Sequence, residues 1–348
     1  IEEIEDTDAV LADICDKAEE LSNGTPMLLA GKEYMAKELE LLTEAYGEKS
    51  AGKIQRFALK HSEKEIDRAT YQAMEALVHN LNTMHSRAGA QIPFSSLNYG
   101  TDTSPEGRLV VKNILLATDS GLGNGETPIF PIHIFKIKEG INYNESDPNY
   151  SLFKLACRVS AKRLFPNFAF LDAPFNKQYY KEGDYRTEIA YMGCRTRVIG
   201  NVYDTDNEIV TGRGNLSFTS INLPRLAIKA DHNVGLFFDM LDEMMDLTID
   251  QLMHRFHIQC QKKVRNYPFL MGQGVWIGSD ALSADDTVEE VLKHGTLSVG
   301  FIGLAEALKA LIGSHHGESE EARELGLEII TAMRERMDLE AKRTGLNF

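Results

Sequence analysis

Short, almost continuous apolar runs that alternate with helical stretches constrain the fold of this chain more than any other feature. The segments TPIFPIHIFKIKEG (127–140) and TLSVGFIG (296–303) are rich in β-branched and aromatic residues, as buried strands are. Longer segments with apolar residues at helical spacing separate such runs, for example GLFFDMLDEMMDLTIDQLMHRFHIQCQKKV (235–264). This alternation predicts an α/β fold with a largely parallel, buried sheet. The pattern alone does not distinguish an open sheet from a closed barrel.

The charge of the chain argues against one class of function. With 348 residues, 43% hydrophobic content and a net charge of −15, it can bury a core but lacks the positive charge that nonspecific nucleic-acid binding requires. No run approaches the roughly 18 apolar residues of a membrane span, and no signal-peptide pattern opens the sequence. The four cysteines form no CxxC pair and no disulfide framework. We therefore expect a reduced, cytoplasmic protein that binds neither nucleic acid nor membrane.

The beginning of the chain differs from the rest. Residues 1–64 are acidic and carry apolar residues at helical spacing, which predicts a helical segment of unassigned role. Residues 65–348 form the larger region in which strands and helices alternate. Because the sequence starts at Ile1 rather than Met and stops after a helical pattern, we expect a fragment of a longer protein.

Local signals predict the surroundings of individual residues. Ser104 followed by Pro105 predicts the start of a helix that ends at Gly121. Cys15 and Cys157 stand among apolar residues of predicted helices, and we expect both to be packed.

Common catalytic and cofactor motifs are weak or absent. GLGNGE (121–126) lacks the spacing of a dinucleotide fingerprint, TGRGN (211–215) is not a Walker loop, and no G-x-S-x-G motif occurs. His254, His257 and Cys260 recur every third residue and could include two metal ligands, but an ordinary amphipathic helix has the same pattern. We expect no metal site in this chain.

The segment AYMGCRTRVIGN (190–201) places Cys194 in an unusual polar setting. In TGRGN, which follows shortly, glycines let the backbone approach a ligand and Asn215 offers both a donor and an acceptor. Nearby arginines could bind phosphates or carboxylates; they are Arg195, Arg197 and Arg213. A ligand site and a structural corner explain these residues equally well.

Several long motifs together resemble one family. They are LVHNLNTMHSRAGAQIPFSSLNYGTDTSPEGR, NGETPIFPIHIFKIKEG, DPNYSLFKLACRVSAKRLFPN, YMGCRTRV, GRGNLSFTSINLPR and YPFLMGQGVW. In residues 65–348 they follow the order found in the anaerobic (class III) ribonucleoside-triphosphate reductases, which this chain closely resembles.

The resemblance implies a fold and a radical chemistry. The family folds as a ten-stranded α/β barrel of two five-stranded halves, which this chain would hold in partly truncated form. It reduces ribonucleoside triphosphates to deoxyribonucleotides. MGCR matches the cysteine that becomes a thiyl radical, so Cys194 inherits that role. GRGN matches an asparagine that hydrogen-bonds the ribose hydroxyls, so Asn215 inherits that role.

Further residues are candidates for substrate binding. Asn98, Tyr99 and Gly100 end a predicted strand just before a helix N-terminus. That position suits phosphate or base contacts, although a plain turn explains these residues equally well. Because side chains alternate along a strand, Arg195 faces away from Cys194, and we expect the arginines outside the reaction centre. The candidates are Asn98, Tyr99, Gly100, Thr196 and Gly214.

The resemblance also implies partners. A glycyl radical, made by a radical-SAM activase with an iron–sulfur cluster, oxidises the cysteine, and a C-terminal zinc site completes the family's reductase. ATP and dNTP effectors act on a homodimer. Neither the glycyl-radical motif nor the zinc-site cysteines occur in this sequence, so we expect no bound cofactor and no turnover by this chain alone.

Two alternatives remain open. The chain could belong to another glycyl radical enzyme, such as a formate-lyase-like protein, although SSLNYGTDTSPEGR and GRGNLSFTSINLPR favour the reductase. It could also be a non-catalytic fragment that only binds nucleotide or dimerises.

Overall fold

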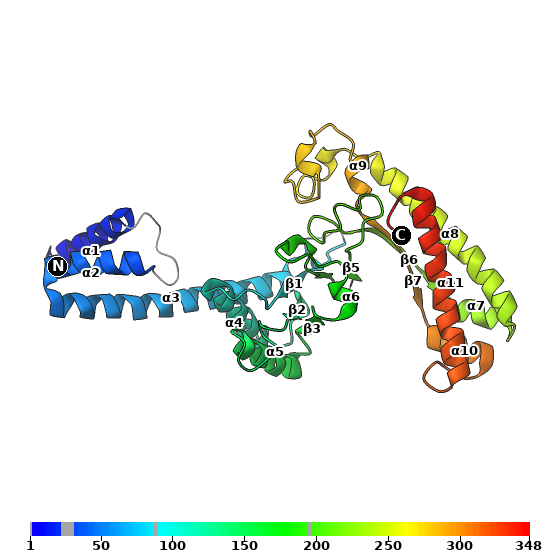
Figure 1. The fold of residues 1–348 in the computed structure, drawn as a ribbon, viewed down its shortest axis with the longest axis horizontal. Coiled ribbons are helices and arrows are strands. Elements are labelled where there is room, and N and C mark those ends of the chain that lie inside the picture. Colours follow the sequence, from blue (N-terminus) through cyan, green and yellow to red (C-terminus); the bar gives the residue numbers. More distant parts are fainter. Residues whose placement is uncertain (1, 22–30, 87–88, 194–195) are drawn as a thin grey trace. The chain divides into compact units, whose positions relative to one another are not determined.

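The computed structural model describes residues 2–21, 31–86, 89–193 and 196–348. The chain divides into two compact units, each treated by itself: Ile1–Pro174 with Tyr191–Arg195, and Phe175–Ala190 with Thr196–Phe348. Both contain helices and parallel strands (Figure 1). The predicted α/β class is therefore confirmed.

In the first unit, three helices precede a region in which strands and helices alternate. The elements are α1 (Glu2–Leu21), α2 (Lys32–Tyr46), α3 (Glu48–Thr83), β1 (Ser96–Tyr99), α4 (Pro105–Ser120), β2 (Ile132–Ile137), α5 (Tyr150–Arg163), β3 (Asn167–Phe170) and β4 (Tyr191–Met192).

The sheet of this unit has the order β1-β2-β3, with both neighbours parallel to β2. Asn98 of β1 lies opposite Ile134 of β2. As the central strand, β2 is buried along almost its whole length, which explains its continuous apolar sequence. The core beside it joins α4, β2 and α5 through Val111, Leu115, Phe135, Ile137, Leu152, Ala156 and Val159.

The helix α3 runs without interruption for 36 residues. Near its start Ala51 packs in a small core with α1 and α2, and near its end Val78 packs against Ile114 and Ala117 of α4. The boundary predicted between residues 64 and 65 falls inside this helix. As a division of the protein into functional parts, it stays a prediction.

The second unit places helices beside a pair of long strands. Its elements are β5 (Thr196–Arg197), β6 (Asn215–Asn222), α7 (Leu223–Ala230), α8 (Val234–Cys260), α9 (Glu289–Leu292), β7 (Thr296–Ile302), α10 (Leu304–Ile312) and α11 (Glu320–Thr344). The short helix α6 (Pro174–Lys177) and three 3-10 turns, Tyr185–Thr187, Val264–Asn266 and Ser279–Ala281, complete the described elements.

Strands β6 and β7 of this unit are parallel along their full length, with Ile221 opposite Phe301. One core packs the end of β6 against α7, α8, α10 and α11, around Phe237, Leu308 and Ile329. A second core joins the other end of α8 to Trp276 and to β7. These two cores keep the strand pair fixed against the long helix α8.

The finer prediction of a ten-stranded barrel is not shown. The described residues contain seven strands, which is too few to close such a barrel, and their parallel sheets have three and two strands. In the described part of the chain, no helix is long and apolar enough to cross a membrane.

The predicted cap of α4 is confirmed, whereas the prediction that Cys15 and Cys157 are packed is wrong. Gly107 N donates to Ser104 Oγ at 3.0 Å, and α4 ends at Gly121. Cys15 and Cys157 are exposed. The buried stripe of α5 passes through the neighbouring Ala156, and adjacent helix positions point about 100° apart, so an apolar neighbour in sequence does not bury a cysteine.

Candidate functional site

Cys194 and Arg195 lie outside the described residues, and the segments on either side of them are described. Gly193, which precedes Cys194, has a φ of 53°, in the left-handed region that favours glycine. Its backbone N–H donates to Ser96 Oγ at 3.2 Å. A Cβ at this position would lie 3.1 Å from Phe94 Cε1. Conformation and space therefore both favour glycine at this position.

Asn98 binds the backbone of Tyr191, three positions before Cys194. Its Nδ2 donates to Tyr191 O and its Oδ1 accepts from Tyr191 N, both at 2.8 Å. The side chain amide therefore pairs with both the N–H and the C=O of one residue, as a residue of a neighbouring antiparallel strand would.

Tyr99 faces a buried histidine. Its hydroxyl lies 3.1 Å from Nδ1 of His133, whose Nε2 lies 3.1 Å from Thr118 Oγ1. His133 is 1% exposed. Burial lowers the pKa of His133 from 6.5 to about 4 and raises the pKa of Tyr99, so both are neutral at pH 7.

Gly100 is enclosed by the chain. Its carbonyl accepts from Asn142 Nδ2 at 3.0 Å and Asn149 Nδ2 at 3.1 Å. A Cβ on Gly100, whose φ is 120°, would lie 2.9 Å from Lys136 O. This explains the glycine at the end of β1 through close packing of the backbone.

Residues after the undescribed pair belong to the second unit. Thr196 is exposed at the start of β5. Arg197 Nη1 donates to Phe175 O and Asn176 Oδ1, both at 2.7 Å, and its guanidinium lies 5.1 Å from the Phe175 ring centroid. The contacts of Arg197 are therefore with the α6 region.

Asn215 begins β6 and is exposed. Its Oδ1 accepts from Ser298 Oγ at 2.7 Å, while Gly214 O accepts from Thr296 N at 3.0 Å. Ser298 was not singled out from the sequence. The feature that could have revealed it is its polar side chain within the apolar run of β7.

Arg213 is buried, contrary to the suggestion that it offers charge to a ligand. Nε donates to His294 O, Nη2 to Gly200 O, and Nη1 to Ile199 O and Ile209 O, at 2.7–3.0 Å. Burial lowers its pKa from 12.5 to about 10, so the guanidinium stays charged at pH 7. Its donors hold the loop before Gly214 and Asn215.

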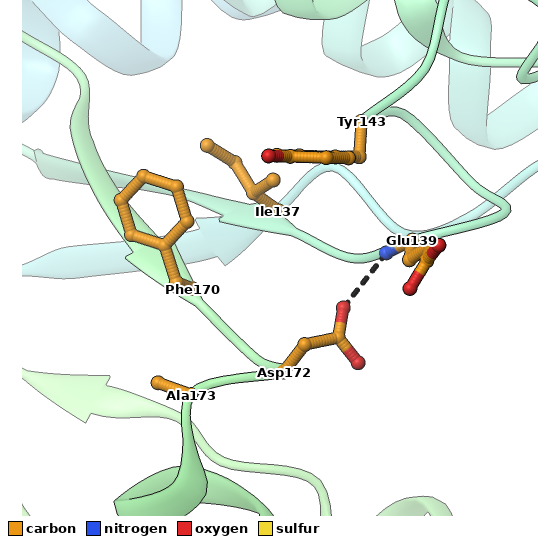
Figure 2. A pocket seen from close by; sticks show the side chains of 6 residues that line it. All are labelled: Ile137, Glu139, Tyr143, Phe170, Asp172 and Ala173. Carbon is orange, nitrogen blue, oxygen red and sulfur yellow. Dashed lines mark hydrogen bonds between the residues drawn. The ribbon is translucent and has the colours of Figure 1, made fainter.

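A cavity of about 360 Å³ opens at the carboxyl ends of β2 and β3, where α/β sheets commonly bind ligands. Figure 2 shows the Tyr143 and Phe170 rings near Ile137, with the Asp172 carboxylate pointing to the backbone of Glu139. Glu139 N donates to Asp172 Oδ2 at 2.8 Å. The lining joins aromatic surface to carboxylates; it comprises Ile137, Glu139, Tyr143, Phe170, Asp172 and Ala173.

In the described part of the chain, no three metal-ligating side chains gather. Of the sequence's metal candidates, His254 and His257 are exposed, whereas Cys260 is 5% exposed and packs in the core around Trp276. Burial raises the pKa of the Cys260 thiol to about 11, which disfavours the thiolate that metal ligation needs.

Comparison with known proteins identifies the family to which the chain is similar. Residues 33–348 match the family model described as anaerobic ribonucleoside-triphosphate reductase. The Escherichia coli enzyme of that name is 35% identical over 80% of this chain and 38% of its own length. That of Enterobacteria phage T4 is 33% identical over 84% of this chain and 46% of its own.

Solved structures agree on the fold. The anaerobic ribonucleotide reductase from Thermotoga maritima in complex with dATP and CTP has a TM-score of 0.51 at 12% identity, over 98% of this chain and 53% of that chain. The chain spans about two fifths of the first curated relatives it matches. The predicted resemblance is confirmed: the chain belongs to the anaerobic ribonucleoside-triphosphate reductase family.

Proposed function

We propose that this chain contributes the hydrogen-abstracting cysteine and a substrate-orienting asparagine to an anaerobic ribonucleoside-triphosphate reductase. Cys194 holds the thiyl position of the family motif, in MGCR, and Asn215 the ribose-binding position, in GRGN. The observation that carries the proposal is that the family match over residues 33–348 runs through both segments.

The chemistry proposed for Cys194 is hydrogen-atom transfer. The Sγ–H bond breaks when its hydrogen atom moves to a glycyl radical, whose loop is not in this sequence. The sulfur then takes a hydrogen atom from ribose C3′, which breaks a C–H bond and restores S–H. Reduction of the ribose consumes two electrons from formate or a thioredoxin-type protein. The residues of this chain position the reactants and exclude water.

Asn215 is suited to bind ribose because its amide is exposed and one end is fixed. Ser298 donates to Oδ1, which leaves Nδ2 as the end that can donate to a ribose hydroxyl. Gly214 would let the backbone approach the substrate, and Thr196 follows Cys194 by two positions in the sequence, so both stay in the proposed site.

The wider architecture and partners are part of the same proposal. We expect the parallel sheets β1–β3 and β6–β7 to belong to the ten-stranded barrel that the resemblance implies. Ribonucleoside triphosphates as substrates, ATP and dNTPs as effectors, a radical-SAM activase, a homodimer and a zinc site outside this chain follow from it too. The relative solved with dATP and CTP supports the nucleotide ligands.

The test is Cys194→Ser in the full-length reductase, with Cys157→Ser as the matched control because Cys157 is an exposed cysteine on α5. We expect Cys194→Ser to lower deoxyribonucleotide formation on the order of a thousandfold or more, because no S–H remains to be transferred. The control should retain activity, and both proteins should gain the glycyl radical signal on activation. Retained activity in Cys194→Ser would sink the proposal. An inactive wild type that carries the radical would favour the non-catalytic alternative.

A further inference from the structure

We propose that Asn98 is a positioning residue that holds the segment carrying Cys194, rather than a substrate-binding residue. The inference rests on the proposed function of Cys194. Asn98 and residues 191–193 belong to the same compact unit, although they lie 93 positions apart in sequence.

The contact is a two-point pair between a side chain amide and the backbone N–H and C=O of one residue. Asn98 Nδ2 donates to Tyr191 O and Tyr191 N donates to Asn98 Oδ1, both at 2.8 Å. Two parallel bonds restrict rotation as well as distance, which a single bond does not. The position of Tyr191 is thereby set relative to β1.

The pair uses both the donor and the acceptor of the asparagine amide. Turning the amide over would bring N–H against N–H and carbonyl against carbonyl. Aspartate has the same shape but no donor, so its second oxygen would face Tyr191 O across an acceptor–acceptor contact. The chemistry of position 98 therefore has a sharp test in a variant that keeps the side chain's size.

Two further contacts attach the same segment to the same face of the chain. Ser96 Oγ accepts from Gly193 N at 3.2 Å, and the Phe94 ring lies so near Gly193 that a Cβ there would be 3.1 Å from Cε1, a tight contact. Phe94, Ser96 and Asn98 are each two positions apart, so along an extended chain they point to one side. They form a row of contacts against residues 191–193.

The strand that carries Asn98 is itself held by a buried neighbouring strand. Asn98 lies opposite Ile134 of the buried strand β2, and the neighbouring Tyr99 is fixed by His133. Functional groups are positioned most accurately by rigid strands with a supporting layer of contacts. Hydrogen-atom transfer depends steeply on the separation of the reacting atoms, and a misplacement of about 1 Å can cost on the order of a hundredfold in rate.

The experiment uses the full-length reductase with Asn98→Asp and Asn98→Ala. The matched controls are Asn82→Asp and Asn82→Ala, because the Asn82 amide also pairs with backbone, at Ile129 and Phe130, and none of its hydrogen bonds among the described residues reaches residues 191–193. The measurements are kcat, the KM for the ribonucleoside triphosphate, the yield of glycyl radical, the thermal midpoint, and hydrogen exchange at the Tyr191 amide.

We expect both Asn98 variants to lower kcat by about tenfold to a hundredfold, with the KM and the radical yield within about twofold of wild type. In Asn98→Ala, the Tyr191 amide should exchange about tenfold faster, because its acceptor is gone. The Asn82 variants should lower the thermal midpoint by a similar amount without either effect.

Other outcomes would overturn the proposal. A raised KM with unchanged kcat would make Asn98 a substrate-binding residue. Equal losses in the Asn82 and Asn98 variants would assign it a general folding role. An unchanged rate of hydrogen exchange at the Tyr191 amide would show that Asn98 does not hold Tyr191. If Cys194→Ser proves active, the proposed function fails, while the exchange measurement still decides whether Asn98 holds Tyr191.

Discussion

Asn98 and Asn215 are the same residue type in two different situations. The Asn98 amide uses its donor on the carbonyl and its acceptor on the N–H of one residue, Tyr191. The Asn215 amide is exposed, its Oδ1 is held by Ser298, and within the described residues its Nδ2 has no hydrogen-bond partner. An amide whose donor and acceptor are both hydrogen-bonded to the protein fixes the protein, whereas an amide with a free donor remains able to bind a ligand. On this difference, and not on residue type, we base the proposals of positioning for Asn98 and substrate contact for Asn215.

The supports behind the two asparagines also differ. Beside Asn98, Tyr99 contacts a buried His133 that burial keeps neutral. Before Asn215, the buried Arg213 keeps its charge and binds only backbone carbonyls. The stability that His133 provides should therefore depend on pH in the acidic range. The stability that Arg213 provides should be lost when its charged side chain is replaced.

The largest effect is expected from Arg213→Met. The substitution leaves four carbonyl oxygens without their buried donor, so we expect the second unit to lose about 3–5 kcal/mol of stability. Thermal unfolding and hydrogen exchange in β6 measure the loss. Arg334→Met is the control, since the Arg334 side chain is 81% exposed and should matter little. Equal behaviour of the two variants would show that Arg213 does not support Asn215.

A smaller effect is expected from acid at His133. Its pKa is about 4 when folded and 6.5 by its ordinary value, so the unfolded state binds more protons between these pH values. The stabilisation is complete above about pH 6.5 and is lost as the pH falls toward 4, by up to about 3 kcal/mol. His133→Asn cannot titrate and should lack this component. The measurement is the pH dependence of unfolding in both proteins; identical curves would contradict a buried, neutral histidine.

The smallest effect is expected from Ser298→Ala. Losing the bond to Asn215 Oδ1 frees the amide to rotate, so we expect kcat/KM to fall about fivefold to tenfold, near 1 kcal/mol. Ser298→Thr keeps the hydroxyl and should restore most activity. In an Asn215→Ala background, Ser298→Ala should change nothing further, because the pair acts as a unit. Additive losses would show that Ser298 acts by another route.

Local features of the fold were predictable because they depend on neighbouring residues. The apolar run of β2 follows from its central position in a parallel sheet, and Ser104 with Pro105 marks the start of α4. The exposed Cys157 was not predicted, because apolar neighbours do not reveal which side of a helix faces the core.

The contacts of the site could not be read from sequence. Asn98 meets Tyr191 across 93 positions and Asn215 meets Ser298 across 83, and no local pattern records such pairs. Arg213 shows the same limit: the sequence gives its charge, but only the fold reveals the four carbonyls around it. The resemblance nominated positions 98 and 215, and the geometry shows that their amides have different partners.

The uninterrupted helix α3 has a mechanical consequence. Its 36 residues extend about 54 Å, with the α1–α2 layer packed near one end and α4, which covers the sheet of β1 and β2, near the other. A continuous hydrogen-bonded helix resists bending, so it acts as a stiff lever. Through α3 and α4, an unbroken series of packed elements therefore connects α1 and α2 to the strand that bears Asn98.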